Sequence, residues 1–255
     1  MELQGVAAIV TGGASGLGGG TADMLAAAGA KVSIFDVNEQ LGQEKARAIG
    51  GKFFKVDVSN EESVLKGVAE AEEAHGIARI CVSCAGIVQA AKVLDREGKP
   101  LPLAEFSKII NVNLIGTFNM LSKFAARAVT AEPLNSDGER GVIINTASVA
   151  AIEGQIGQPA YAASKGGVAA LTLPVAREFA RSGIRVMTIA PGIFWTPMME
   201  SLPKEAQESL GKQVPFPNRL GTAQEYAALV QHIITNPMLN GELIRLDGAI
   251  RMAAK

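Results

Sequence analysis

Short apolar runs alternate with longer helical patterns along most of the sequence, and this alternation limits the fold to a few classes. The apolar runs typical of strands cover residues 6–11, 31–36, 52–58, 79–86, 141–148, 184–192 and 242–246. Helical patterns follow at about 20–30, in a polar stretch that ends at Gly50, and at about 59–75, 104–130, 159–182 and 222–235. Strands that alternate with helices form βαβ units, whose right-handed crossovers bury a parallel sheet between two helical layers. We predict an α/β fold with a single doubly wound parallel sheet and helices on both faces.

Composition and length fit one such domain and exclude several functions. The chain has 255 residues, of which 48% are hydrophobic and 19% charged, and no change of composition divides it. We therefore predict a single domain over residues 1–255. The net charge of -1 provides no strong field for nucleic acid or for an anionic membrane. Because no run reaches the ~18 apolar residues of a membrane span and no signal peptide is visible, we expect a cytoplasmic protein without nucleic-acid or membrane partners.

The two cysteines have the spacing of a redox pair or half a metal site. Cys81 and Cys84 fall in a predicted strand, however, where positions three apart point to opposite faces. The two histidines, His75 and His232, have no ligand-like spacing to them. We expect buried thiols and no metal site.

A glycine-rich turn follows the first predicted strand. "VAAIVTGGASGLGGG" places Gly12, Gly16 and Gly18 between a strand and a helix. Glycines let the backbone turn tightly and approach a pyrophosphate, while the helix N-terminus supplies free N–H groups and a positive dipole. The spacing differs from G-x-G-x-x-G, so a tight turn without a ligand remains the alternative at this point.

An acid at the end of the second predicted strand favours a dinucleotide. Asp36 follows Gly18 by eighteen residues, where a carboxylate can accept hydrogen bonds from ribose hydroxyls. The same charge repels the 2′-phosphate of NADP. The neighbouring positions hold Ala14, Ser15 and Val37, so no Arg or Lys is there to bind that phosphate. We predict NAD rather than NADP as the cofactor.

Asp57 and Val58 end the third predicted strand at the same edge of the sheet. Asp57 can reach an adenine amino group while Val58 packs near the ring. An acid that merely precedes a helix is an equally good interpretation of this position.

Three residues form a candidate proton-transfer site. Ser148 ends a predicted strand, at the edge where open α/β sheets bind ligands. Tyr161 and Lys165 are four residues apart on a predicted helix and so share one face. The lysine charge can lower the tyrosine pKa toward neutral pH, and the serine can stabilise a substrate oxygen that gains charge. Spacing alone would make Tyr161 and Lys165 an accidental pair, but their position beside the glycine turn favours catalysis.

An asparagine in the middle of the long predicted helix is a fourth candidate. Asn113, in "IINVNLIGTFN", is a poor residue for a helix interior. It can accept a local bend and hold a water next to Lys165, which would give a proton path to solvent. Asn111 competes for this role, and only the helix register separates the two.

Together these motifs resemble the short-chain dehydrogenase/reductase family, whose fold is a Rossmann domain. "TGGASGLG", "SCAG", "NVNLIG", the Ser148, Tyr161 and Lys165 triad, and "APGIFWT" match its motifs across the chain. Ser83 departs from the asparagine usual in this family, which would loosen a hydrogen bond that braces the backbone.

Within this family, almost the whole chain is similar to the type II 3-hydroxyacyl-CoA dehydrogenases, also called 17β-hydroxysteroid dehydrogenase type 10. "GVIINTASVAAIEGQIGQPAYAASKGG" and "NGELIRLDGAIRM" carry much of this likeness. The resemblance implies an NAD-dependent homotetramer that oxidises short or branched 3-hydroxyacyl-CoA esters to 3-oxoacyl-CoA, reversibly, and often steroid alcohols.

The resemblance also assigns cofactor contacts to individual residues. Carried over onto this sequence, the cofactor-binding set is Gly12, Ser15, Gly16, Leu17, Gly18, Asp36, Asp57, Val58, Cys84, Ala85, Gly86, Tyr161, Lys165, Phe194 and Thr196. Cys84, Ala85 and Gly86 would act through their backbone. Phe194 and Thr196 would meet the nicotinamide end.

A long apolar segment at about 192–217 is the candidate substrate loop. Its larger apolar residues, which suit an acyl chain or a steroid, are Phe194, Trp195, Met198, Met199 and Leu202. Packing of a small core within the loop is an equally good interpretation.

Three other functions stay open. A steroid or other secondary-alcohol dehydrogenase would differ only in the pocket. A 3-oxoacyl-carrier-protein reductase usually prefers NADPH and a basic docking patch, which Asp36 and the neutral charge disfavour. A non-catalytic NAD-binding regulator would be free to lose Ser148, Tyr161 or Lys165, and all three are present.

Overall fold

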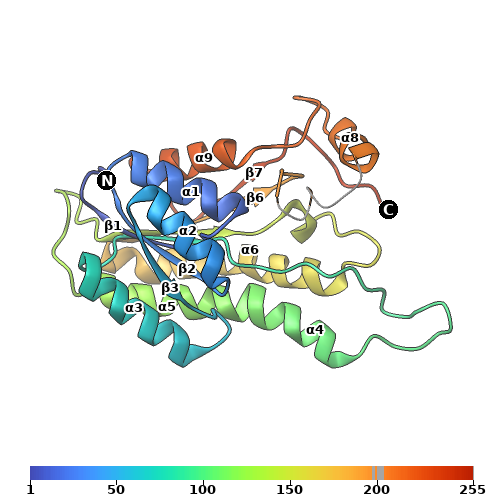
Figure 1. The fold of residues 1–255 in the computed structure, drawn as a ribbon, viewed down its shortest axis with the longest axis horizontal. Coiled ribbons are helices and arrows are strands. Elements are labelled where there is room, and N and C mark those ends of the chain that lie inside the picture. The colour runs from blue at the N-terminus through green and yellow to red at the C-terminus, as the bar shows by residue number, and fades with distance from the viewer. Residues whose placement is uncertain (197–198, 200–203, 255) are drawn as a thin grey trace.

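A computed structural model describes residues 1–196, 199 and 204–254 (Figure 1). Within these residues seven strands form one sheet in the order β3-β2-β1-β4-β5-β6-β7, and every neighbouring pair is parallel. Along the chain the strands are β1 (Ala7–Thr11), β2 (Lys31–Asp36), β3 (Lys52–Lys55), β4 (Ile80–Ser83), β5 (Gly141–Thr146), β6 (Ile184–Pro191) and β7 (Leu243–Leu246). The order reverses between β1 and β4, the position where doubly wound sheets bind ligands. The predicted fold class is confirmed.

Helices cover both faces of the sheet (Figure 1). One layer consists of α1 (Gly16–Ala27), α2 (Glu39–Ile49) and α9 (Ala223–Thr235). The other contains α3 (Glu61–His75), α5 (Gly116–Ala128) and α6 (Pro159–Phe179), with α4 (Leu103–Ile110) beside α6. Two separate apolar clusters lie between these layers and the sheet, because alternate residues of each buried strand point to opposite sides. No helix among the described residues has the length and hydropathy needed to cross a bilayer.

The predicted helix over 104–130 is present but contains an irregular turn at Asn113, the residue expected to accept a local bend. A π-helical turn at Asn111–Ile115 separates α4 from α5. Asn113 lies inside this turn and is fully buried, whereas Asn111 is exposed. The extra residue that a π turn accommodates lets Asn113 point inward.

Three predicted strands end at least two residues earlier than expected; one of them, β4, stops at Ser83, so Cys84 lies beyond the strand in which it was predicted. The loop at 192–217 is not irregular throughout. Strand β3 ends at Lys55 and β5 at Thr146, so Asp57, Val58 and Ser148 lie beyond the strands rather than in them. Ser148 leaves the strand because its hydroxyl caps a short 3-10 turn, accepting a hydrogen bond from the N–H of Ala150 at 3.1 Å. The loop contains a helix, α8 (Lys204–Lys212).

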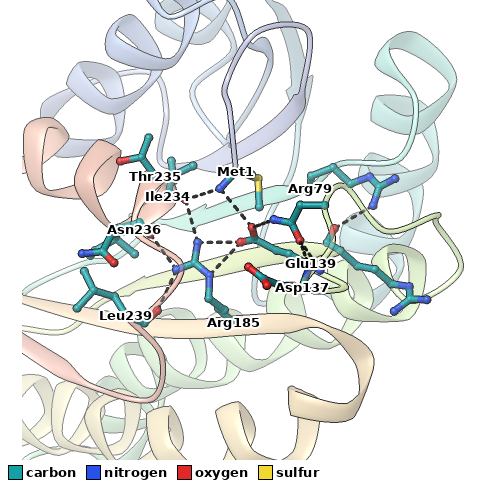
Figure 2. Close-up of polar contacts among 12 residues, drawn as sticks. Met1, Arg79, Asp137, Glu139, Arg185, Ile234, Thr235, Asn236 and Leu239 are labelled. Atoms are coloured by element: carbon teal, nitrogen blue, oxygen red, sulfur yellow. Dashed lines mark hydrogen bonds and ion pairs between the residues drawn. The ribbon is translucent and has the colours of Figure 1, made fainter.

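Helix α9 is anchored at both ends. At its start, Thr222 and Glu225 form a reciprocal capping box. At its end, the guanidinium of Arg185 donates to the carbonyl oxygens of Ile233 and Ile234 (Figure 2). Arg185 also pairs with the buried carboxylate of Glu139 at 2.9 Å. This ion pair ties the C-terminal end of α9 to β6 and to the loop before β5.

Candidate active site

The glycine turn has the geometry that only glycine tolerates. Gly12 and Gly16 have φ angles of 63° and 54°, in the left-handed region. A Cβ on Gly18 would lie 2.2 Å from the carbonyl oxygen of Gly12. Helix α1 begins at Gly16, and the side chain of Ser15 at its N-cap makes no capping hydrogen bond. The first N–H groups of the helix, including that of Leu17, therefore have no side-chain cap and can meet an anion.

Asp36 lies directly against this turn. Its carboxylate accepts a hydrogen bond from the N–H of Ala14 at 3.2 Å and another from the N–H of Asn38 at 2.9 Å. The next residue, Val37, is 61% exposed, so its side chain covers the edge with apolar rather than basic surface. A capless helix N-terminus beside a fixed carboxylate fits the diphosphate and adenosine ribose of a dinucleotide.

The backbone after β4 forms the next part of the edge. The N–H groups of Cys84 and Ala85 both donate to Thr11, at 3.1 Å each, which fixes the segment against β1. A Cβ on Gly86 would lie 3.2 Å from Oδ1 of Asn113 and 3.6 Å from Nζ of Lys165. The segment from Cys84 to Gly86 therefore lies between Thr11 of β1 and the side chains of Asn113 and Lys165.

Asp57 and Val58 differ in their surroundings. Asp57 is exposed, and its carboxylate accepts hydrogen bonds from the N–H and hydroxyl of Ser59. Val58 is 6% exposed and packs against Gly116 in the core, so only Asp57 of the two presents its side chain to solvent at this edge.

Ser148, Tyr161 and Lys165 come together beyond the end of β5. Tyr161 and Lys165 lie on the first turns of α6, and Nζ of Lys165 is 5.8 Å from the centre of the Tyr161 ring. Hydrogen bonding with Ser148 acts to lower the Tyr161 pKa. The ammonium of Lys165 donates to the carbonyl oxygen of Thr146 at 2.7 Å. Thr146 was not among the predicted site residues, although it lies in the same "NTAS" stretch as Ser148.

The ionisation of this cluster differs from the predicted direction. Burial raises the pKa of Tyr161 above its ordinary value, and the opposing effect of Ser148 is smaller. Burial also lowers the pKa of Lys165 to about 8. The ammonium of Lys165 donates to Thr146 rather than to the phenol, and burial rather than this charge dominates the Tyr161 pKa.

The Asn113 side chain hydrogen-bonds the residues next to this cluster. Its amide accepts from the N–H of Ile87 at 2.8 Å and donates to the carbonyl of Ile87 at 2.9 Å and to the hydroxyl of Ser164 at 3.0 Å. Ser164 in turn donates to the carbonyl of Tyr161. Asn113 thus connects the segment after β4 to the turn of α6 that carries Tyr161.

At the last pair of the β4–β5 ladder, Ser83 and Asn145 leave buried polar side-chain atoms without hydrogen bonds. Ser83 is in register with Asn145 of β5. The hydroxyl of Ser83 and both amide atoms of Asn145 are buried and have no hydrogen-bond partner. This agrees with the expected loss of a bracing contact where the family has asparagine.

The candidate substrate loop packs largely on itself and on the core. Phe194 is 7% exposed and joins the apolar cluster under α1 and α9, whereas Trp195 is 39% exposed. A small separate cluster contains Ile193, Val214, Leu220 and Ile250, with Met199, Leu210 and Met252 packed against it. Thr196 is partly exposed, and Met198 and Leu202 lie outside the described residues. Packing within the loop therefore accounts for Met199, and Trp195 keeps surface for a ligand.

Cys81 is a buried thiol and Cys84 is half-buried. Burial raises the pKa of Cys81 to about 12, and both cysteines are free. In the part of the chain that the structure describes, no three His, Cys, Asp or Glu side chains group as a metal site would require.

Comparisons with known proteins agree with this geometry. A model of the family described as short chain dehydrogenase matches residues 6–207. The 3-hydroxyacyl-CoA dehydrogenase type-2 of Homo sapiens is 50% identical, over 98% of this chain and 97% of its own. The crystal structure of 3-hydroxyacyl-CoA dehydrogenase type-2 from Mycobacterium avium superposes with a TM-score of 0.94 at 43% identity, covering 98% of both chains. The 3-oxoacyl-[acyl-carrier-protein] reductase of Thermotoga maritima is 31% identical over 98% of this chain and 99% of its own.

Proposed function

Because the chain belongs to the short chain dehydrogenase family, it is an oxidoreductase that uses a nicotinamide cofactor, and we propose its substrate and mechanism on that premise. The enzyme oxidises the 3-hydroxy group of short or branched 3-hydroxyacyl-CoA esters to 3-oxoacyl-CoA, reversibly. The main support is the convergence of Ser148, Tyr161 and Lys165 beside the glycine turn. The 50% identity to a protein named 3-hydroxyacyl-CoA dehydrogenase type-2 favours the acyl-CoA class.

NAD rather than NADP is the proposed cofactor. Asp36 supports this choice because its carboxylate is held at the turn, where a 2′-phosphate would meet like charge. The helix α1 N-terminus, the backbone of Cys84 to Gly86 and Thr196 would hold the remainder of the cofactor. When bound, the nicotinamide ring accepts the hydride that leaves the substrate carbon.

Tyr161 is the proposed base. As phenolate it takes the proton of the substrate hydroxyl, and Ser148 donates a hydrogen bond to the same oxygen. Burial raises the Tyr161 pKa, so this role needs positive charge nearby, and Lys165 supplies it from 5.8 Å. Asn113 keeps α6 in place through Ser164, and it would hold a water next to Lys165 that gives the proton a path to solvent.

The substrate enters beneath the 192–217 loop in this proposal, and residues 1–255 act as one domain. We expect a homotetramer, as the resemblance implies. The exposed apolar side chains of Ile115, Phe118 and Leu173, near or on α5 and α6, support self-association. Light scattering tests it, and a monomer at working concentration would contradict it.

A substrate panel with NAD tests the proposed activity. Short, branched and long 3-hydroxyacyl-CoA esters are compared with steroid alcohols and with a 3-oxoacyl carrier protein plus NADPH. We expect the highest kcat/KM for a short or branched acyl-CoA. A higher value for a steroid or for the carrier protein would replace the proposed substrate. Cofactor binding without turnover of any substrate would indicate a regulator instead.

A further inference from the structure

Three polar side chains meet behind the proposed catalytic lysine. Cys84 follows β4, Thr146 ends β5, and Tyr226 projects from the first turn of α9. The hydroxyls of Thr146 and Tyr226 are 2.7 Å apart, and the thiol of Cys84 lies 3.5 Å from the first and 3.7 Å from the second. Tyr226 is 0% exposed and is the largest fully buried side chain among the residues that the structure describes. A tyrosine hydroxyl at such depth needs partners, and these two groups provide them.

The hydrogen count lets these three groups form a closed ring. Each carries one hydrogen and can also accept one. Thr146 donates to the sulfur of Cys84, and the thiol of Cys84 donates to the oxygen of Tyr226. The remaining hydrogen, on Tyr226, then points to the hydroxyl of Thr146. Every donor and acceptor of the ring is used once, so removal of any member leaves a buried group without its partner.

The ring joins β4 and β5 where the backbone no longer does. The parallel ladder between these strands ends with Ser83 opposite Asn145. The next residue, Thr146, is paired through its backbone only with Ile189 of β6. Beyond this point, at the edge of the sheet that carries the site, the segment after β4 and the end of β5 are joined by the side-chain contact between Cys84 and Thr146.

Thr146 is also the hydrogen-bond acceptor of the lysine. Its carbonyl oxygen receives the ammonium of Lys165 at 2.7 Å, while its hydroxyl belongs to the ring. We infer that Tyr226 is a positioning residue for Lys165: its hydroxyl holds Thr146 in the orientation that places the lysine ammonium for proton transfer. Tyr226 itself contacts none of the reacting groups of the proposed mechanism.

Helix α9 is suited to this task because it is held at both ends. The capping box at Thr222 and Glu225 lies within one turn of Tyr226. The carbonyl groups at the other end are bound by Arg185, which is fixed in turn by Glu139 (Figure 2). Because α9 is fixed, the hydrogen bond between Tyr226 and Thr146 holds the end of β5 in place.

The inference rests on the proposed function, since it concerns the role of Lys165. Burial lowers the pKa of Lys165 to about 8, so near neutral pH its ammonium is charged and its position acts on Tyr161. The pH profile of kcat therefore reports where the ammonium lies.

In Tyr226→Phe we expect kcat near neutral pH to fall about three- to tenfold, because a misplaced ammonium stabilises the phenolate less. The acid midpoint of the kcat profile should rise by about 0.5–1. Thr146→Val, which keeps the carbonyl but removes the hydroxyl, should reproduce both effects. The double variant should be no worse than either single one, since both open the same ring.

Val230→Ala provides the matched control. Val230 is fully buried on α9, four residues after Tyr226, and its truncation removes packing but no hydrogen bond. It should lower the melting temperature and leave the kcat profile unchanged. A wild-type kcat profile in both Tyr226→Phe and Thr146→Val would overturn the inference. If Tyr226→Phe does not fold, Thr146→Val decides. Absence of wild-type turnover on any 3-hydroxyacyl-CoA would refute the proposed function, whereas wild-type turnover with an unchanged profile in both variants would refute this inference alone.

Discussion

The carboxylate of Asp36 accepts a hydrogen bond from the N–H of Ala14, 22 positions earlier in the chain, at 3.2 Å. The end of one strand is thereby joined to the glycine turn that follows its neighbour. The same contact holds a negative charge where the ribose of a dinucleotide would lie.

Removal of this charge should weaken selection for NAD. For Asp36→Ser we expect the KM for NAD to rise about tenfold or more, because hydrogen bonds to a charged group are lost. Activity with NADP should increase relative to activity with NAD. Steady-state kinetics with both cofactors measures this. Asp23→Asn is the control, since it removes an exposed acid of α1 that pairs with Lys45 and should leave cofactor preference unchanged. A wild-type preference in Asp36→Ser would contradict the assignment.

Loss of the phenol oxygen should remove proton transfer and little else. Tyr161→Phe keeps the ring, so NADH binding followed by fluorescence should be unaffected. We expect kcat to fall about 10²- to 10⁴-fold, the usual contribution of a general base. Turnover near the wild-type rate with intact cofactor binding would show that another group takes the proton.

Lys165 should make the protein less stable at neutral pH. Its pKa in the folded protein is about 8, below the ordinary value of 10.5, because the charge is buried. Folding therefore carries a cost below about pH 8, and that cost disappears as the pH rises from about 8 to 10.5, where the unfolded chain releases its proton. Lys165→Met should be inactive yet more stable near pH 7 by about 1–3 kcal/mol.

Urea unfolding at about pH 7 and at about pH 10 tests this prediction. The advantage of Lys165→Met should shrink at the higher pH. Lys66→Met, at a lysine whose side chain is 76% exposed, is the control and should show no such pH dependence. A variant that is less stable than the wild type at both pH values would disprove the predicted cost.

The buried ion pair under α9 should contribute to stability rather than to catalysis. Arg185 and Glu139 are 7% and 5% exposed, so Glu139→Gln leaves a buried cation without its anion. We expect unfolding to become easier by about 3–5 kcal/mol. Glu72→Gln breaks a more exposed pair with Arg127 and should cost at most about 1 kcal/mol. Equal losses in the two variants, measured by chemical denaturation, would contradict this view of the buried pair.

The strands were largely predictable because a buried parallel strand is a local apolar run. All seven predicted runs contain an observed strand, and Asp36 does end β2. The residues at which strands end were harder to predict, because a single side-chain hydrogen bond can end a strand. The run at 141–148 stops at Thr146 because Ser148 caps the next turn. The π turn within the predicted helix at 104–130 has a tertiary cause, because it lets the Asn113 side chain hydrogen-bond both Ile87 and Ser164.

The sequence by itself determined the order of the strands and helices, the glycine turn, and the placement of Ser148, Tyr161 and Lys165 near one edge, since periodicity and short spacing encode these. Only the tertiary structure decided what the lysine ammonium contacts and what lies behind it. The hydroxyls of Thr146 and Tyr226 are 80 residues apart and meet because β5 and α9 pack on each other. Burial, which sets the pKa directions of Tyr161 and Lys165, likewise arises from many distant segments and has no signature in local spacing.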